Sequence, residues 1–283
     1  MNQTVLTNTA TQSPPLTEQR IRGCLYGLAA GERNGGPVRM ALRVGQSLAA
    51  HRGFDAEDIF SRYRHWWREG AIDTGNVFAM VMTRMDYDGM TCREAVTWVD
   101  NKLKGRTAGV NPAHRIAPLA CCLSVRDGEL ASITREEAQL SHASPIAADA
   151  SAFVAVLLRA LIRGEDWQRA LTLAGQQIQH PQSRLTRQAP LLPLDENGFA
   201  PTIVANALHF VEQAGSFEAA LTASIRHAGG ANYSPVLVGA IAGALYAPDC
   251  RTLAVEVHGE ALMDQYEGMV SSLVQAQLQG EVR

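Results

Sequence analysis

The stretch from His227 to Ala247 constrains the fold more than any other part of this 283-residue chain. A polar loop comes first, and an apolar run follows in which small residues recur at spacings of three and four: Gly239, Ala240, Gly243, Ala244 and Ala247. At these spacings they share one face of a helix, where the absence of large side chains lets another backbone approach closely. Pro235 suits the first turn of such a helix, because its missing N–H needs no partner there. The pattern predicts a buried helix that holds a polar loop in a fixed place.

Most of the remaining chain shows apolar residues at helical spacing. We expect helices at residues 20–31, from residue 40, and at 55–69, 91–104, 134–140, 147–162, 166–179, 202–212, 216–228, 236–245 and 253–278, the last as one helix or two. The alternation typical of strands is nearly absent, and residues 180–200 are irregular. The sequence therefore predicts a single compact all-α domain over residues 18–283. Residues 1–17, rich in Thr, Asn and Gln, are predicted to be a disordered lead-in.

The composition argues against several classes of protein. The net charge is −3 and the 25 basic residues are scattered, so we expect no nucleic-acid partner. We identify no apolar stretch of the roughly 18 residues that span a bilayer, and so expect no membrane contact. Five cysteines, without a Cys-x-x-Cys pair, are typical of reduced thiols in a cytoplasmic protein. Nothing in the sequence sets the oligomeric state.

The loops between the expected helices carry a series of motifs. The His227–Ala247 stretch resembles the closing motif of the ADP-ribosylglycohydrolase superfamily, Gly-Gly-Asp-x-Asp-Thr followed by a Gly-Ala-Ile-x-Gly-Ala helix. Residues 27–36 resemble its opening Gly-x-x-x-Gly-Asp-Ala-x-Gly, and residues 36–42 stand at its Asp-Asp-Thr-x-Met-x-Leu. Residues 73–76, 109–119 and 141–145 resemble Asp-Ile-Gly, Gly-Asn-Gly-x-x-Met-Arg-x-x-Pro-Leu and Thr-His-x-x-Pro. The resemblance covers roughly residues 20–247 and implies the all-α fold of the dinitrogenase reductase-activating glycohydrolases and related crystallins.

This resemblance also implies a cleft for ADP-ribose with two Mg²⁺ ions, held largely by aspartates of the closing motif and of the Asp-Asp-Thr motif. The residues at those aspartate positions are Gly36, Pro37, Ala231 and Tyr233. Glu32 and Asp73 are the carboxylates left in the motif loops. Because Mg²⁺ prefers several oxygen ligands, mostly carboxylates, these two would hold at most one weakly bound ion. We therefore expect a divergent member that needs no cofactor.

The polar residues that stand in these loops predict a metal-independent pocket. Glu32 or Asp73 would activate water or stabilise a positively charged transition state, and His114 would protonate the leaving group. The candidate substrate-binding residues are Arg33, Asn34, Arg39, Asn76, Asn111, Arg115, His142, Asn232, Tyr233 and Ser234. The three arginines suit a phosphate or carboxylate.

Several of these residues also have structural interpretations. Arg115 would fasten its own loop, and His142 would brace a turn. Asp73 would cap the helix that begins near Asn76. Tyr233 would fill the space where the family binds metals. These alternatives stay open on the sequence alone.

The function that this sequence favours is hydrolysis or elimination at a glycosidic bond of a small ribosyl or ADP-ribosyl-like anionic substrate, without the usual two Mg²⁺ ions. The alternative is a non-catalytic pseudoenzyme or binding protein that uses the same cleft. A third interpretation is a metal-dependent hydrolase that recruits Asp195 or Glu196 from the irregular segment.

Overall fold

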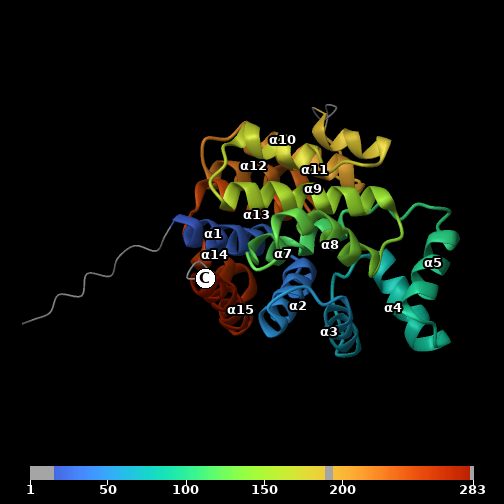
Figure 1. Ribbon diagram of the computed structural model, residues 1–283. Helices are drawn as coiled ribbons and strands as arrows, with labels where there is room; N and C mark the ends of the chain where they lie inside the picture. Colours follow the sequence, from blue (N-terminus) through green and yellow to red (C-terminus); the bar gives the residue numbers. More distant parts are fainter. Residues whose placement is uncertain (1–15, 189–193, 281–283) are drawn as a thin grey trace, which may run out of the picture.

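The computed structural model describes residues 16–188 and 194–280 and, within them, contains helices and no strand (Figure 1). The helices are α1 (Leu16–Gly31), α2 (Gly36–His51), α3 (Ala56–Arg68), α4 (Asn76–Asp88), α5 (Cys92–Lys102), α6 (Asn111–Arg115), α7 (Ala117–Cys121), α8 (Asp127–Gln139), α9 (Pro145–Ile162), α10 (Trp167–Gly175), the 3₁₀ helix η1 (Pro181–Arg187), α11 (Ala200–Glu212), α12 (Phe217–Ala228), α13 (Ser234–Tyr246), α14 (Arg251–His258) and α15 (Glu260–Gly280). An isolated bridge joins Gly109 to Phe199. The all-α prediction is confirmed.

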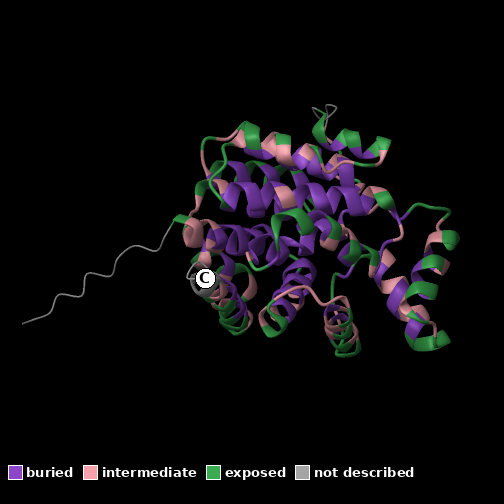
Figure 2. Cartoon of the chain, viewed as in Figure 1, coloured by how far each residue is buried: buried purple, intermediate pink, exposed green. Residues whose placement is uncertain are grey.

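Helix α13 is the central element of the fold. Every residue from Ser234 to Ala244 is buried, and α13 packs against α1, α9, α11 and α12. Buried residues concentrate along these central helices, whereas exposed ones lie on the peripheral helices (Figure 2). The polar loop before α13 therefore directly precedes a helix that is buried over Ser234–Ala244.

The small-residue face of α13 lies against a matching row of glycines on α1. A Cβ atom on Gly27 would lie 2.1 Å from the carbonyl oxygen of Gly239, and one on Gly243 would lie 2.0 Å from that of Gly23. Such distances are far below van der Waals contact, so only glycine allows the two backbones to cross here. The predicted close approach of a second backbone is confirmed, and its partner is α1.

Helix α9 corrects one expectation. Its 18 residues are long and apolar enough to cross a membrane, whereas we expect no such stretch from the sequence. Within the structure 89% of this helix is buried in the protein. Its charged side chains have partners: Arg159 binds backbone carbonyls of α7 and the loop after it, and Asp149 accepts hydrogen bonds from Arg135. These features are those of a core helix.

Helices α4 and α5 form a hairpin to one side of the main body (Figure 1). Phe78 and Met82 of α4 belong to the main core, and the other buried residues of the hairpin make a second hydrophobic cluster: Val81, Met85, Ala95, Val96 and Val99. Thr91 and Glu94 form a capping box that begins α5. The α4–α5 hairpin therefore has a hydrophobic cluster of its own and is joined to the main core through α4.

Element boundaries differ from the expected ones in several places. The expected loop at 109–119 contains the two short helices α6 and α7, and part of the irregular segment forms η1. Each of these three short helices has a proline in its first turn, which leaves too few residues for a visible periodicity. Helix α1 begins at Leu16, and residues 1–15 of the expected lead-in lie outside the described residues.

Candidate functional site

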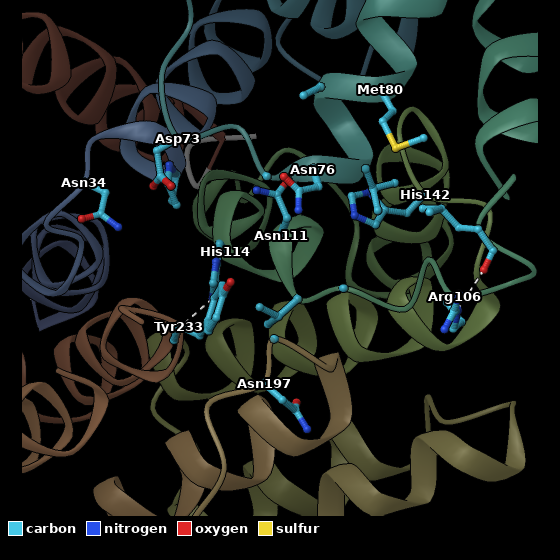
Figure 3. Close-up of a pocket in the computed structure, with 18 of the residues that line it drawn as sticks. Asn34, Asp73, Asn76, Met80, Arg106, Asn111, His114, His142, Asn197 and Tyr233 are labelled. Atoms are coloured by element: carbon cyan, nitrogen blue, oxygen red, sulfur yellow. Dashed lines mark hydrogen bonds between the residues drawn. The ribbon is translucent and has the colours of Figure 1, made fainter. Parts of the chain in front are cut away.

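The motif loops surround an elongated pocket of about 1010 Å³. Its lining includes eight of the predicted site residues: Asn34, Asp73, Asn76, Asn111, His114, His142, Asn232 and Tyr233. Asn34 and Asp73 lie at one end, Asn111 and His114 in the middle, and Met80 and Arg106 toward the other end (Figure 3). A pocket of this size accommodates a nucleotide-sized ligand.

Asp73 is the one carboxylate among the described residues that line the pocket. Its side chain is exposed, and its backbone has a left-handed φ of 48°. Burial of part of the group raises the pKa of Asp73, and the nearby charge of Glu32 raises it further. The carbonyl oxygen of Asp73 lies so close to Gly36 that a Cβ there would be 1.9 Å away. The glycine at this motif position therefore allows Asp73 to approach α2.

Glu32, the other expected catalytic carboxylate, does not line the pocket. It is completely buried, and its two oxygens accept hydrogen bonds from the backbone N–H groups of Asn34 and Gly35, each at 2.6 Å. Asn232 donates a further hydrogen bond to it at 3.3 Å. Burial raises the pKa of Glu32, and the N–H groups of Gly35 and Asn34 oppose that rise. Glu32 holds two loops together beneath Asp73, so a direct catalytic role does not fit its position.

Two of the arginines expected to bind an anion instead form hydrogen bonds within and between the motif loops. Arg33 donates through Nε to Asn232 Oδ1 at 3.0 Å, and Arg39 donates to the Gly35 carbonyl at 2.9 Å. Neither lines the pocket. Asn232 has a φ of 56°, a left-handed conformation that asparagine tolerates well. The loop before α13 is thus tied directly to the loop between α1 and α2.

Ser234 is likewise absent from the pocket lining, although it was expected to bind substrate. It is fully buried, and both its hydroxyl and its backbone N–H donate to the carboxylate of Glu196. Glu196 therefore satisfies a free N–H at the start of α13 and neutralises part of the helix dipole there. This pairing connects residues 194–199 to the central helix.

Arg115, the third expected anion-binding residue, lies in a buried network. Its guanidinium is fully buried and donates through Nε to Glu137 at 2.7 Å, with Tyr63 donating to the same Glu137 oxygen. Further hydrogen bonds run from Arg115 to Asn111 Oδ1 at 3.0 Å and to Ser141 Oγ at 2.9 Å. With its charge satisfied internally, Arg115 orients other residues and does not meet a ligand.

This network favours a donor role for two pocket residues. Arg115 occupies Asn111 Oδ1, so the amide group of Asn111 is the part left for a ligand. Ser141 Oγ accepts from Arg115 and lies 2.8 Å from His142 Nδ1, and the nearby positive charge of Arg115 favours donation of the serine proton to that nitrogen. In this tautomer His142 carries its proton on Nε2, and His142 and Asn111 are both hydrogen-bond donors in the middle of the pocket.

His114 has the opposite arrangement. Its Nε2 lies 2.9 Å from the Tyr233 carbonyl, which only accepts, so the proton is on Nε2 and Nδ1 is an acceptor. The Tyr233 ring stacks on His114 with ring centres 6.4 Å apart. Burial lowers the pKa of His114 to about 4, so the ring is neutral at neutral pH. His114 was expected to donate a proton to the leaving group. With these contacts it is neutral, and its Nδ1 is a hydrogen-bond acceptor.

The two histidines predict a loss of stability in acid. Burial lowers the pKa of His142 to about 3, and the charge of Arg115 adds to this effect. Both folded-state values lie below the unfolded value of about 6.5, so the stability they contribute is complete above that pH and declines as the pH falls toward the folded values. We expect each to cost about 2 kcal/mol between pH 7 and pH 5.

Urea unfolding of the wild type and His114→Gln at both pH values measures this effect. The pH-dependent difference should be smaller in the variant by about 2 kcal/mol. An identical pH dependence in the two proteins would show that His114 is not held neutral.

The metal pair implied by the family resemblance would need free oxygen ligands in the motif loops. The described residues contain no group of three or more His, Cys, Asp or Glu side chains placed to hold a metal ion. Both Glu32 oxygens already accept hydrogen bonds, and Gly36, Pro37 and Ala231 offer no side-chain ligand. Such a donor set does not fit a pair of Mg²⁺ ions, which need several free oxygen ligands each.

Several lining residues come from outside the motif loops and were not predicted. Met80, Arg84 and Trp98 lie on the α4–α5 hairpin, with Arg106 following it and Asn197 in the segment before α11. A surface arginine or tryptophan on an amphipathic helix gives no signal that it faces a ligand. Only the positions of the hairpin and of the segment before α11 beside the loops assign these residues to the pocket.

Comparisons with known proteins agree with this architecture. A family model described as ADP-ribosylglycohydrolase matches residues 38–250. The ADP-ribosyl-[dinitrogen reductase] glycohydrolase of Rhodospirillum rubrum is 23% identical over 212 residues, which cover 75% of this chain and 68% of that protein. A solved structure named ADP-ribosylglycohydrolase-related protein complex matches with a TM-score of 0.70 and 23% identity, covering 92% of this chain and 98% of the other. The chain therefore belongs to the ADP-ribosylglycohydrolase family, and this membership supports a glycohydrolase-like function.

Proposed function

We propose that the protein hydrolyses a glycosidic bond of a ribosyl or ADP-ribosyl-like anionic substrate without a pair of metal ions. The observation that carries this proposal is the position of Asp73, a carboxylate at one end of an elongated pocket with hydrogen-bond donors along it. Cleavage at an anomeric carbon develops positive charge there, which a neighbouring carboxylate stabilises. The R. rubrum relative, named for removing ADP-ribose from a protein, supports this choice of substrate class.

In the proposed reaction, water attacks the anomeric carbon as the bond to the leaving group breaks. Asp73 accepts a proton from the attacking water, and the leaving group takes the bonding electrons and a proton from Asp73 or solvent. His142 and Asn111 donate hydrogen bonds to substrate oxygens, while His114 accepts one from a hydroxyl. Each of these roles uses the protonation state that the hydrogen-bond network favours.

Thermal unfolding with ADP-ribose, in Mg²⁺ and again in EDTA, tests the proposal first. A ligand at about 100 times its Kd adds about 2.7 kcal/mol to stability, which is a readily visible rise in Tm. We expect the same rise in EDTA, because the described residues offer no metal pair, and release of ADP-ribose from an ADP-ribosylated protein in EDTA. A rise only with Mg²⁺ would overturn metal independence. Binding without product would favour the non-catalytic alternative.

A further inference from the structure

We propose that Arg84 and Arg106 form the anion-binding end of the pocket and receive a phosphate group of the substrate. This inference deepens the proposed function and rests on it for the use of this pocket. Among the described residues that line the pocket, these two carry the permanent positive charges. The three arginines that the motifs suggested for this task are bound elsewhere or lie outside the lining.

Arg84 is held in place from two sides. Its guanidinium lies over the Trp98 ring, 4.9 Å from the ring centre, and its Nη1 pairs with Asp88 at 2.9 Å. Stacking fixes the plane of the guanidinium while leaving its edges able to donate. The Asp88 pair lies on the surface, with side-chain exposures of 32% and 38%, so it is weak and exchangeable for a phosphate.

Arg106 follows α5, and a hydrogen bond to the backbone holds the Nε end of its guanidinium. Its Nε donates to the Leu103 carbonyl at 3.2 Å, while its terminal nitrogens form no hydrogen bond or ion pair with the described residues. Arg106 and Arg84 line the same pocket, Arg84 from α4 and Arg106 from the residues that follow α5.

The charges in the pocket are separated along its length. Asp73 lies at one end and Arg106 at the other, with the neutral Asn111 and His142 between them (Figure 3). A substrate that develops positive charge at its reacting carbon and carries phosphate at a distance matches this order. The two arginines thus determine the orientation of the substrate in the pocket.

Titration with inorganic pyrophosphate, followed by calorimetry, tests the arginine end without any reaction. We expect Arg84→Met and Arg106→Met each to weaken pyrophosphate binding about tenfold, because each removes charge-assisted hydrogen bonds but keeps an apolar stem. Arg93→Met is the matched control: it removes the same charge from the same hairpin, outside this pocket, and should change the Kd less than about twofold. Asp88→Asn should tighten binding severalfold, because it frees Arg84.

The outcomes separate this inference from the proposed function. No pyrophosphate binding by the wild type, or equal losses for Arg84→Met and Arg93→Met, would overturn the arginine site. Absence of hydrolysis would instead overturn the proposed reaction, and the pyrophosphate affinities of the variants would stand. If both hold, the two arginine variants should raise KM for an ADP-ribosylated protein about as much as they raise the Kd for pyrophosphate, with kcat nearly unchanged.

Discussion

Replacing Asp73 with asparagine is expected to lower kcat by about 10²- to 10⁴-fold, the usual contribution of a positioned general base. Asparagine has nearly the same shape and accepts the left-handed backbone at this position, so the fold should be unchanged. Turnover of an ADP-ribosylated protein measures the loss, and urea unfolding measures the stability. Unchanged turnover would remove Asp73 from the mechanism.

The pH profile gives a second measure of the same residue. Because burial and Glu32 raise the pKa of Asp73, the acid limb of kcat/KM should lie above the usual value for aspartate, about 3.9. Activity is lost as the pH falls through that raised pKa, since a protonated Asp73 accepts no proton from water. Asp264→Asn, an exposed change on α15, is the matched control and should leave both kcat and the limb unchanged.

Replacing Gly27 with alanine is expected to destabilise the protein by about 3 kcal/mol or more, at the upper end of overpacked core changes. The added Cβ would lie 2.1 Å from the backbone oxygen of Gly239, and no side chain can rotate away to relieve the contact. The helices α1 and α13 would have to move apart along the central crossing of the fold. Urea unfolding gives the free energy directly.

Gly268→Ala provides the comparison for that measurement. Gly268 is an exposed residue within α15, and a Cβ there meets nothing within 4 Å. Alanine should therefore stabilise the protein by up to about 1 kcal/mol through its higher helix propensity. A similar effect of both substitutions would mean that the α1–α13 contact is looser than the structure indicates.

The central helix and its glycine face could be predicted because each residue contributes a local, periodic signal. The spacing of Gly239 and Gly243 already requires a close neighbour, although it does not identify α1 as that neighbour. The order of the motif loops likewise indicated the family. Local patterns did not show which helices that are distant in the sequence pack against each other.

Arg115 shows why much of the candidate site could not be predicted. In the sequence it is a basic residue in a polar motif, and nothing nearby indicates a partner. Its charge is balanced by Glu137, which lies on α8 in a stretch that reads as an ordinary surface helix. The same applies to Arg84, whose assignment to the pocket depends on how the α4–α5 hairpin docks beside the loops. Burial and docking are tertiary properties, and the motif spacing does not encode them.

The separate hydrophobic cluster of the α4–α5 hairpin has a consequence for how such a protein can change over evolutionary time. Val81 and Val99 pack in the hairpin cluster, whereas Phe78 and Met82 join α4 to the main core. Arg84 and Trp98 belong to neither set of buried residues, so they can be substituted while the α1–α13 crossing stays intact. If Arg84 binds the substrate as proposed, mutations that change ligand choice are separated in the structure from mutations at the α1–α13 crossing that lower the free energy of unfolding. Substitutions of Arg84 and Trp98 are then expected to change specificity with little loss of stability.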